Sequence, residues 1–195
     1  MSIKKIVKYG TPSLREKSKE VHKISKKVQI LVDDLYDTLY AANGVGLAAP
    51  QIGENIRVFV IDVGTDPKTM NPITFINPKI LKKEGAVNSY EGCLSFPEAF
   101  TNVRRYKYVK VKALDIKGKP FIIEADDGSL LARAIQHEND HLDGILFIDH
   151  VVNRFDADEK LAQNGLPPIN PDKILDESNL DEILAKEPQK EDKND

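Results

Sequence analysis

The sequence predicts an α+β domain in which mostly antiparallel strands surround one central helix. Two long stretches, Ser25 to Ala42 and Leu130 to Asp143, place apolar residues at helical spacing. Between them lie short segments that are wholly apolar or that alternate apolar and polar residues, as strands do. With 195 residues, 41% of them apolar, the chain is long enough to bury a core. We expect one domain over residues 1–165, followed by an extension over residues 166–195.

The first helix is expected from Ser25 to Ala42. Ser25 has the side chain of an N-cap residue, and the Asn43-Gly44 pair is typical of a helix end. The apolar stripe of this helix consists of residues that stand three or four apart: Val28, Leu31, Val32, Leu35 and Leu39.

Strands are expected in the middle of the chain. Residues 57–63 are largely apolar, which indicates a buried strand. Residues 74–83 favour another extended segment, interrupted at Pro78 because proline cannot donate a ladder hydrogen bond. Two further segments alternate apolar and polar residues and are joined by a Lys-Gly-Lys sequence typical of a hairpin turn: residues 108–115 and 120–125.

The last predicted helix carries the pattern H-E-x-x-H at residues 137–141. Two histidines four residues apart project from one face of a helix, so both imidazoles can bind one metal ion. Glu138 continues the apolar stripe of the helix, so we expect it to point inward, where desolvation raises its pKa and suits it to proton transfer. Gly144 follows as a left-handed cap. The alternative is a solvated helix with two surface histidines.

A tetrahedral catalytic metal ion needs a third protein ligand and keeps one position for water. The chain has a single cysteine, Cys93, and it lies in the segment Glu91-Gly92-Cys93-Leu94-Ser95. One cysteine cannot form an internal disulfide, and no apolar signal segment is visible, so we expect a reducing compartment, the cytoplasm. A lone cysteine is commonly an inert buried residue. Both interpretations of Cys93, ligand or buried thiol, therefore stay open on these residues alone.

A glycine-containing segment, residues 43–51, follows the first helix. Its glycines allow backbone to approach a ligand closely, and Gln51 can donate a hydrogen bond to a developing oxyanion. An ordinary helix exit would have a similar composition. The segment is not a phosphate loop, since no Lys-Ser/Thr follows, and it lacks the third glycine of a dinucleotide fingerprint.

With these segments in view, the chain resembles the peptide deformylase family from about residue 3 to residue 150. The likeness is carried by three segments that match the family's motifs in order: residues 44–51, 91–95 and 136–142. It implies a metal-dependent hydrolase that removes the N-formyl group from the initiator methionine of newly made polypeptides and releases formate.

The resemblance also implies a role for each matching residue. The metal ligands would be Cys93, His137 and His141. The general base and acid would be Glu138, and the oxyanion would be bound by the Gln51 side chain and the Leu94 backbone N–H. Gly46 would contact the formyl group or the substrate backbone. The methionine pocket would be bordered by Val45, Glu91, Leu130, Arg133 and Ala134. The usual ion in the family is Fe2+, and Zn2+, Ni2+ or Co2+ can also occupy the site.

The charge pattern limits the partners. A net charge of −3 gives no argument for sequence-specific nucleic-acid binding. No run of about 18 apolar residues exists, so we expect no membrane span. Basic residues cluster at 104–107 and 110–112, which we interpret as the polar face of a strand, with a ribosome contact as the alternative. The expected partners are N-formyl-methionyl nascent peptides, with transient ribosome association as a further option.

The extension over residues 166–195 contains prolines and is acidic. Asp176 to Lys186 could form a short acidic helix, whereas Glu187 to Asp195 has no aliphatic residue and is expected to be disordered.

Proteins of two other functional classes could carry part of this sequence pattern. A metallopeptidase of another type would also carry H-E-x-x-H, but it requires a third histidine or a glutamate downstream, and His150 does not have the usual spacing. A structural metal or redox-sensing site would require a fourth protein ligand, and no second cysteine exists to supply it.

Overall fold

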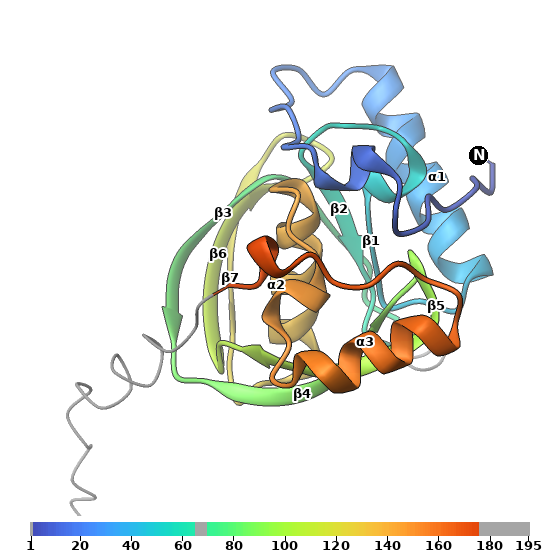
Figure 1. The fold of residues 1–195 in the computed structure, drawn as a ribbon. Coiled ribbons are helices and arrows are strands. Elements are labelled where there is room, and N and C mark those ends of the chain that lie inside the picture. Colours follow the sequence, from blue (N-terminus) through green and yellow to red (C-terminus); the bar gives the residue numbers. More distant parts are fainter. Residues whose placement is uncertain (1, 65–69, 176–195) are drawn as a thin grey trace, which may run out of the picture.

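The computed structural model describes residues 2–64 and 70–175 (Figure 1). Its α-helices are α1 (Lys26–Ala41), α2 (Leu130–Leu142) and α3 (Arg154–Gln163). Its strands are β1 (Gly46–Ala48), β2 (Val58–Ile61), β3 (Ile73–Glu84), β4 (Val87–Cys93), β5 (Phe96–Arg105), β6 (Tyr108–Leu114) and β7 (Pro120–Ala125). Short 3-10 helices are η1 (Pro12–Arg15), η2 (Ala49–Ile52), η3 (Phe147–His150) and η4 (Pro171–Lys173).

Antiparallel pairing dominates the fold. Five strands form one sheet in the order β1-β2-β3-β6-β7, and β4 pairs with β5 in a separate two-stranded sheet. All the pairs between neighbouring strands of these sheets are antiparallel. Helix α2 lies in the middle of the molecule, with β3, β6 and β7 on one side of it and β1 and β2 on the other (Figure 1). The α+β fold with a central helix, expected from the sequence, is confirmed.

The apolar run of β2 is explained by its two covered faces. Phe59 and Ile61 belong to the core that contains Ile135 of α2. Val58 and Val60, which alternate with them, pack in a second core with the apolar stripe of α1. Because successive side chains of a strand point to opposite faces, a strand covered on both sides must be apolar throughout. The buried strand expected over residues 57–63 is therefore confirmed.

The interruption expected at Pro78 is a shift in register. Strand β3 continues through Pro78, and its pairing with β6 is irregular between Ile76 and Lys79. Asn77 has a positive φ of 49° there, and its side chain bonds to both the N–H and the carbonyl of Val21. The missing donor of the proline thus falls at a bulge, and the strand can continue beyond it.

Other boundaries also follow the sequence. Helix α1 begins one residue after Ser25, whose side chain makes no capping hydrogen bond, so only its position as N-cap is as expected. Gly144 has the left-handed φ of 71° expected after α2. The predicted hairpin over residues 108–125 is formed by β6 and β7. Strands β4 and β5 and helix α3 were not expected.

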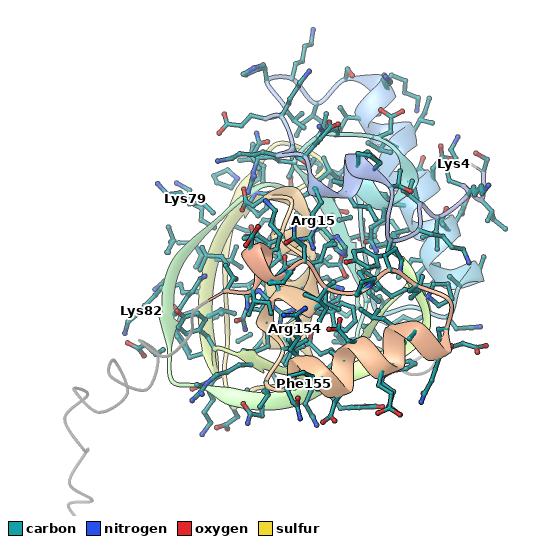
Figure 2. All side chains as sticks on the ribbon, viewed as in Figure 1. Lys4, Arg15, Lys79, Lys82, Arg154 and Phe155 are labelled. Atoms are coloured by element: carbon teal, nitrogen blue, oxygen red, sulfur yellow. The ribbon has the colours of Figure 1, made fainter. Side chains whose placement is uncertain are left out.

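Both charged and large apolar side chains lie on the surface of the fold. Lys79 and Lys82 point away from the sheet, and Phe155 at the start of α3 points into solvent (Figure 2). No helix in the described part of the chain is long and apolar enough to cross a membrane.

Part of the C-terminal extension lies against the domain. Ile169 is buried in the core that contains Phe96, Phe147 and Leu161. A boundary near residue 165 stays a prediction. The acidic helix and the disordered end that we expect lie outside the described residues.

Candidate metal centre and pocket

Three potential metal ligands converge between β4 and α2. Cys93 is the last residue of β4, and His137 and His141 lie one turn apart on α2. The ligand atoms of the three residues all lie within 4.8 Å of one another. Cys93 Sγ is 3.3 Å from His141 Nε2. A thiol and two imidazoles so placed fit one divalent ion, since these donors suit iron or zinc by their softness.

Local structure positions each ligand. The Ser129 side chain accepts a hydrogen bond from the Ala132 N–H and so caps the N-terminus of α2. On β4, the pairing with β5 shifts in register between Gly92 and Cys93, at the point where the chain turns into β5. Such an irregularity commonly re-aims a side chain next to a site, and here it accompanies the approach of Cys93 to the helix.

The two histidines have different surroundings. His137 Nδ1 lies 3.2 Å from Glu91 Oε2, an arrangement that orients the imidazole and leaves Nε2 for a metal ion. Burial acts to lower the pKa of His137, but the neighbouring Cys93 and Glu91 hold that pKa well above its usual value. For His141, burial and the charge of His137 hold the pKa well below the usual value, so its imidazole is neutral, the form that binds metals.

Glu138 points inward, as expected. The side chain is buried, and within the described part of the chain its Oε2 atom has no hydrogen-bond partner. Burial raises the pKa of Glu138 to about 7, although the positive charges of His137 and Arg105 oppose this change. A Cβ placed on Gly46 would lie 2.6 Å from Glu138 Oε1, so the glycine makes room for the carboxylate.

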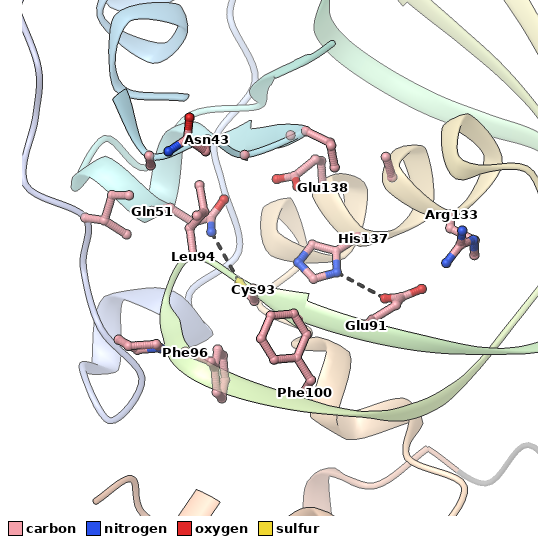
Figure 3. A pocket seen from close by; sticks show the side chains of 18 of the residues that line it. Asn43, Gln51, Glu91, Cys93, Leu94, Phe96, Phe100, Arg133, His137 and Glu138 are labelled. Atoms are coloured by element: carbon pink, nitrogen blue, oxygen red, sulfur yellow. Dashed lines mark hydrogen bonds and ion pairs between the residues drawn. The ribbon is translucent and has the colours of Figure 1, made fainter. Parts of the chain in front are cut away.

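The amide of Gln51 is also fixed. Its Oε1 accepts a hydrogen bond from the Ala48 N–H at 2.8 Å. This contact turns Nε2 toward Cys93 Sγ, at 3.4 Å, and Ser95 Oγ, at 3.3 Å (Figure 3). Gln51 therefore presents a donor to the same space as the three ligand residues.

A cavity of about 550 Å³ opens beside these groups. The lining includes eleven of the twelve residues that the sequence analysis singled out: Val45, Gly46, Gln51, Glu91, Cys93, Leu94, Leu130, Arg133, Ala134, His137 and Glu138. His141, the twelfth, does not line the cavity and is almost fully buried. The stacked rings of Tyr90 and Phe100, which the sequence analysis did not single out, also border the cavity and are both exposed. Phe100 lies below Cys93 in Figure 3.

Sequence reasoning missed a buried charge network. Arg105 was assigned to the polar face of a strand, but its side chain is only 2% exposed, so this assignment was wrong. Along β5 the buried residues alternate, and Thr101, Val103 and Arg105 share the inner face. The period-2 pattern would have placed Arg105 inside, had the strand been recognised. Asp140 and His150 belong to the same network, and the sequence around them does not indicate that they are part of it.

Comparison with known proteins identifies the family. The family model for polypeptide deformylase matches residues 3–156. The chain belongs to the polypeptide deformylase family. It is 52% identical over 149 residues to peptide deformylase 1 of Clostridium acetobutylicum, covering 76% of this chain and 95% of that protein. It is 44% identical over 165 residues to peptide deformylase 1 of Bacillus subtilis, covering 85% of this chain and all of that protein.

Solved deformylase structures have the same fold. The peptide deformylase of Synechococcus elongatus, in complex with actinonin, superposes with a TM-score of 0.81 at 37% identity, over 88% of this chain and 91% of that one. The peptide deformylase of Thermotoga maritima gives 0.73 at 38% identity, over 78% of this chain and all of that one. Family membership makes this chain a metal-dependent hydrolase that removes N-formyl groups from new polypeptides.

Proposed function

We propose that Cys93, His137 and His141 hold one divalent metal ion, and that Glu138 moves the proton in the removal of the formyl group from N-formyl-methionyl nascent peptides. The observation that carries this proposal is the convergence of three ligand atoms within 4.8 Å, beside the cavity that Glu138 lines. When bound, the ion would act as a Lewis acid and lower the pKa of a water molecule. Among the described residues the group has three members, which leaves a position for substrate or water.

Glu138 is the group placed to move the proton. Its buried Oε2 has no hydrogen-bond partner among residues 2–64 and 70–175, and its Oε1 lies against the backbone of Gly46 at the cavity wall. We propose that this carboxylate takes a proton from the attacking water and returns it to the amine nitrogen when the bond between carbon and nitrogen breaks. The products are formate and a free N-terminus.

Two donors would stabilise the oxyanion that forms on the formyl carbon. Gln51 Nε2 is already oriented by the bond between Gln51 Oε1 and the Ala48 N–H, so little reorganisation is needed. The backbone N–H of Leu94, next to Cys93, would be the second donor. Gly46 would allow the substrate backbone to approach because it has no side chain.

The methionine side chain would occupy the part of the cavity near Val45, Leu130 and Ala134, with Glu91 and Arg133 at its edges. A mostly apolar slot suits a flexible thioether. The Arg133 Nε atom donates to the Gly128 carbonyl at 3.1 Å, which holds the guanidinium at the N-terminal end of α2 and leaves its stem to cover apolar surface.

Fe2+ is the ion we propose, with Zn2+, Ni2+ and Co2+ able to bind the same ligands. Ligand softness does not separate iron from zinc, so this choice rests on the family resemblance. We also propose that the protein works where polypeptides are made, in the cytoplasm and in transient contact with the ribosome, because its substrates arise there. The buried position of Arg105 removes it from any basic contact surface.

The catalytic domain is proposed to lie within residues 1–165, because the family match ends at residue 156. Residues 166–195 would then be an acidic, proline-containing extension.

Formate release tests the proposed function. The protein would be stripped with a chelator, reloaded with Fe2+, Ni2+ or Zn2+ under reducing, anaerobic conditions, and given a formyl-methionyl dipeptide. We expect formate from the reloaded samples and none from the stripped one. No release from any reloaded sample, each with one ion per chain, would overturn the proposal.

A further inference from the structure

Arg105 connects the two segments that supply the metal ligands. Its Nε and Nη2 donate to the Glu91 carboxylate at 2.9–3.2 Å, and its Nη1 donates to Asp140 Oδ2 at 2.6 Å. Glu91 stands two residues before Cys93 on β4, and each of the two side chains contacts a histidine of α2. Asp140 stands immediately before His141 on α2. One guanidinium thus spans the strand with the thiol ligand and the helix with the imidazole ligands.

The network extends in both directions from this guanidinium. Glu91 Oε2, which accepts from Arg105, also contacts His137 Nδ1 at 3.2 Å. At the other end, Asp140 Oδ2 lies 2.9 Å from Nε2 of His150, the last residue of η3. Contacts therefore lead from His150 through Asp140, Arg105 and Glu91 to the ring of His137.

The charged groups of this network are buried, which restricts the partners that each of them can have. Arg105 is nearly inaccessible, and Glu91, Asp140 and His150 are largely buried beside it. Such charges are costly to remove from water, and a buried ion pair adds little net stability. Removing one member of a buried ion pair is costly because the charge of the remaining member is left without a partner inside the protein. A buried network of this kind is suited to fixing geometry.

The end of the network is itself held in place. Asp149, next to His150, pairs with Arg15 and accepts a hydrogen bond from the Leu146 N–H at 2.8 Å. The Asp149 carbonyl accepts from the Leu175 N–H at 2.8 Å. Segment η3 is therefore anchored through Asp149 by contacts outside the metal ligands, in addition to the stacking of its Phe147 on His137, so His150 can act as a fixed point for Asp140.

We infer that Asp140 and His150 are positioning residues for the metal site: they fix Arg105, which sets Glu91 against His137 and holds the Cys93 strand at the distance its ion requires. The inference rests on the proposed metal ligands. Partners one step removed from the ligands commonly change metal affinity 10- to 100-fold when lost. Because His150 lies several contacts away, we expect an effect of about tenfold, at the lower end of that range.

Cobalt binding to the full-length protein tests the inference. His150→Phe removes the donor to Asp140, whereas His150→Gln keeps an amide donor at the same reach. Co2+ would be the probe, with affinity measured by chelator competition and the site observed through the thiolate-to-cobalt absorption band. Val32→Ala is the control, because it weakens a core beside α1 that contains none of the ligands.

We expect His150→Phe to weaken Co2+ binding about tenfold and to shift the absorption band, with His150→Gln close to wild type. Val32→Ala should lower the melting temperature and leave the Co2+ affinity and the absorption band unchanged. Unchanged affinity and spectrum in His150→Phe, or an equal loss in Val32→Ala, would overturn the inference. Asp140→Asn carries the same test if His150→Phe does not fold. If the wild-type protein binds no Co2+, the proposed ligands themselves are wrong. If the wild type binds Co2+ and His150→Phe binds it equally well, only the positioning role is wrong.

Discussion

The Glu138 carboxylate lies against the backbone of Gly46, so closely that a Cβ on Gly46 would fall 2.6 Å from Glu138 Oε1. Gly46 belongs to β1 at the edge of the five-stranded sheet, and Glu138 belongs to α2. The packing of the central helix against this edge strand therefore sets the position of the proposed proton carrier. Backbone approach of this kind requires a residue without a side chain.

Gly46→Ala should displace Glu138 and leave the three ligand residues in place. A displaced proton carrier loses part of its contribution to the transition state, so we expect kcat/KM to fall about 10- to 100-fold with the metal retained. Formate release and metal content measured on the same sample check this. Gly165→Ala, at a position with open space and positive φ, is the control for general destabilisation. Full activity in Gly46→Ala would show that the carboxylate tolerates displacement.

Cys93→Ala should weaken metal binding by roughly 100-fold or more, because it removes one of three protein ligands. Metal analysis after dialysis against a chelator measures the loss. Ser95→Ala changes a buried neighbour that is not a ligand, and it should keep its ion. Equal retention of metal in the wild type and in Cys93→Ala would identify the thiol as a merely packed group.

Air should inactivate the iron-loaded protein faster than the zinc-loaded protein. Fe2+ and the thiol of Cys93 can be oxidised, whereas Zn2+ has no redox chemistry. Activity would be followed over time in air for iron-, nickel- and zinc-loaded samples, with anaerobic samples as controls. The same rate of decay for all three ions would rule out oxidation of the iron as the cause.

Ala134→Trp should fill the methionine slot. Ala134 lies on α2 at the cavity wall, one turn before His137 and Glu138. We expect kcat/KM on formyl-methionyl peptides to fall about 10- to 100-fold with the ion retained, since the indole would occupy the space proposed for the methionine side chain.

Ala134→Leu, with a smaller increase in volume, controls for folding. Activity on formyl-methionyl and formyl-alanyl peptides would be compared for both variants. An unchanged preference for methionine in Ala134→Trp would place the slot elsewhere.

Much of the site is local in sequence, and that part could be predicted. The spacing of His137 and His141 and the inward direction of Glu138 follow from helix geometry alone. The meeting of Cys93 with the two histidines does not, because it depends on a hairpin and a helix far apart in the chain. The resemblance to a known family supplied that relation, and the structure brings the three residues together.

The elements that were missed share a weak local pattern. Strand β4 contains Asn88, Ser89 and Gly92, residues that are uncommon in strands, and Glu91 is its one buried residue. Helix α3 buries only Ala157 and Leu161, too few to give a helical stripe. Arg105 looked like a surface residue because its partners, Glu91 and Asp140, come from other elements. Non-local pairing of charges leaves no periodic signal.

The proton transfer assigned to Glu138 is the central claim, and the Glu138→Ala variant tests it most directly. The change removes the carboxylate and leaves Cys93, His137 and His141 intact. Metal content and formate release from a formyl-methionyl dipeptide would be measured on the same anaerobic preparation. We predict one ion per chain and a turnover lower by about 10²- to 10⁴-fold. Turnover near the wild-type rate in fully loaded Glu138→Ala protein would contradict the mechanism.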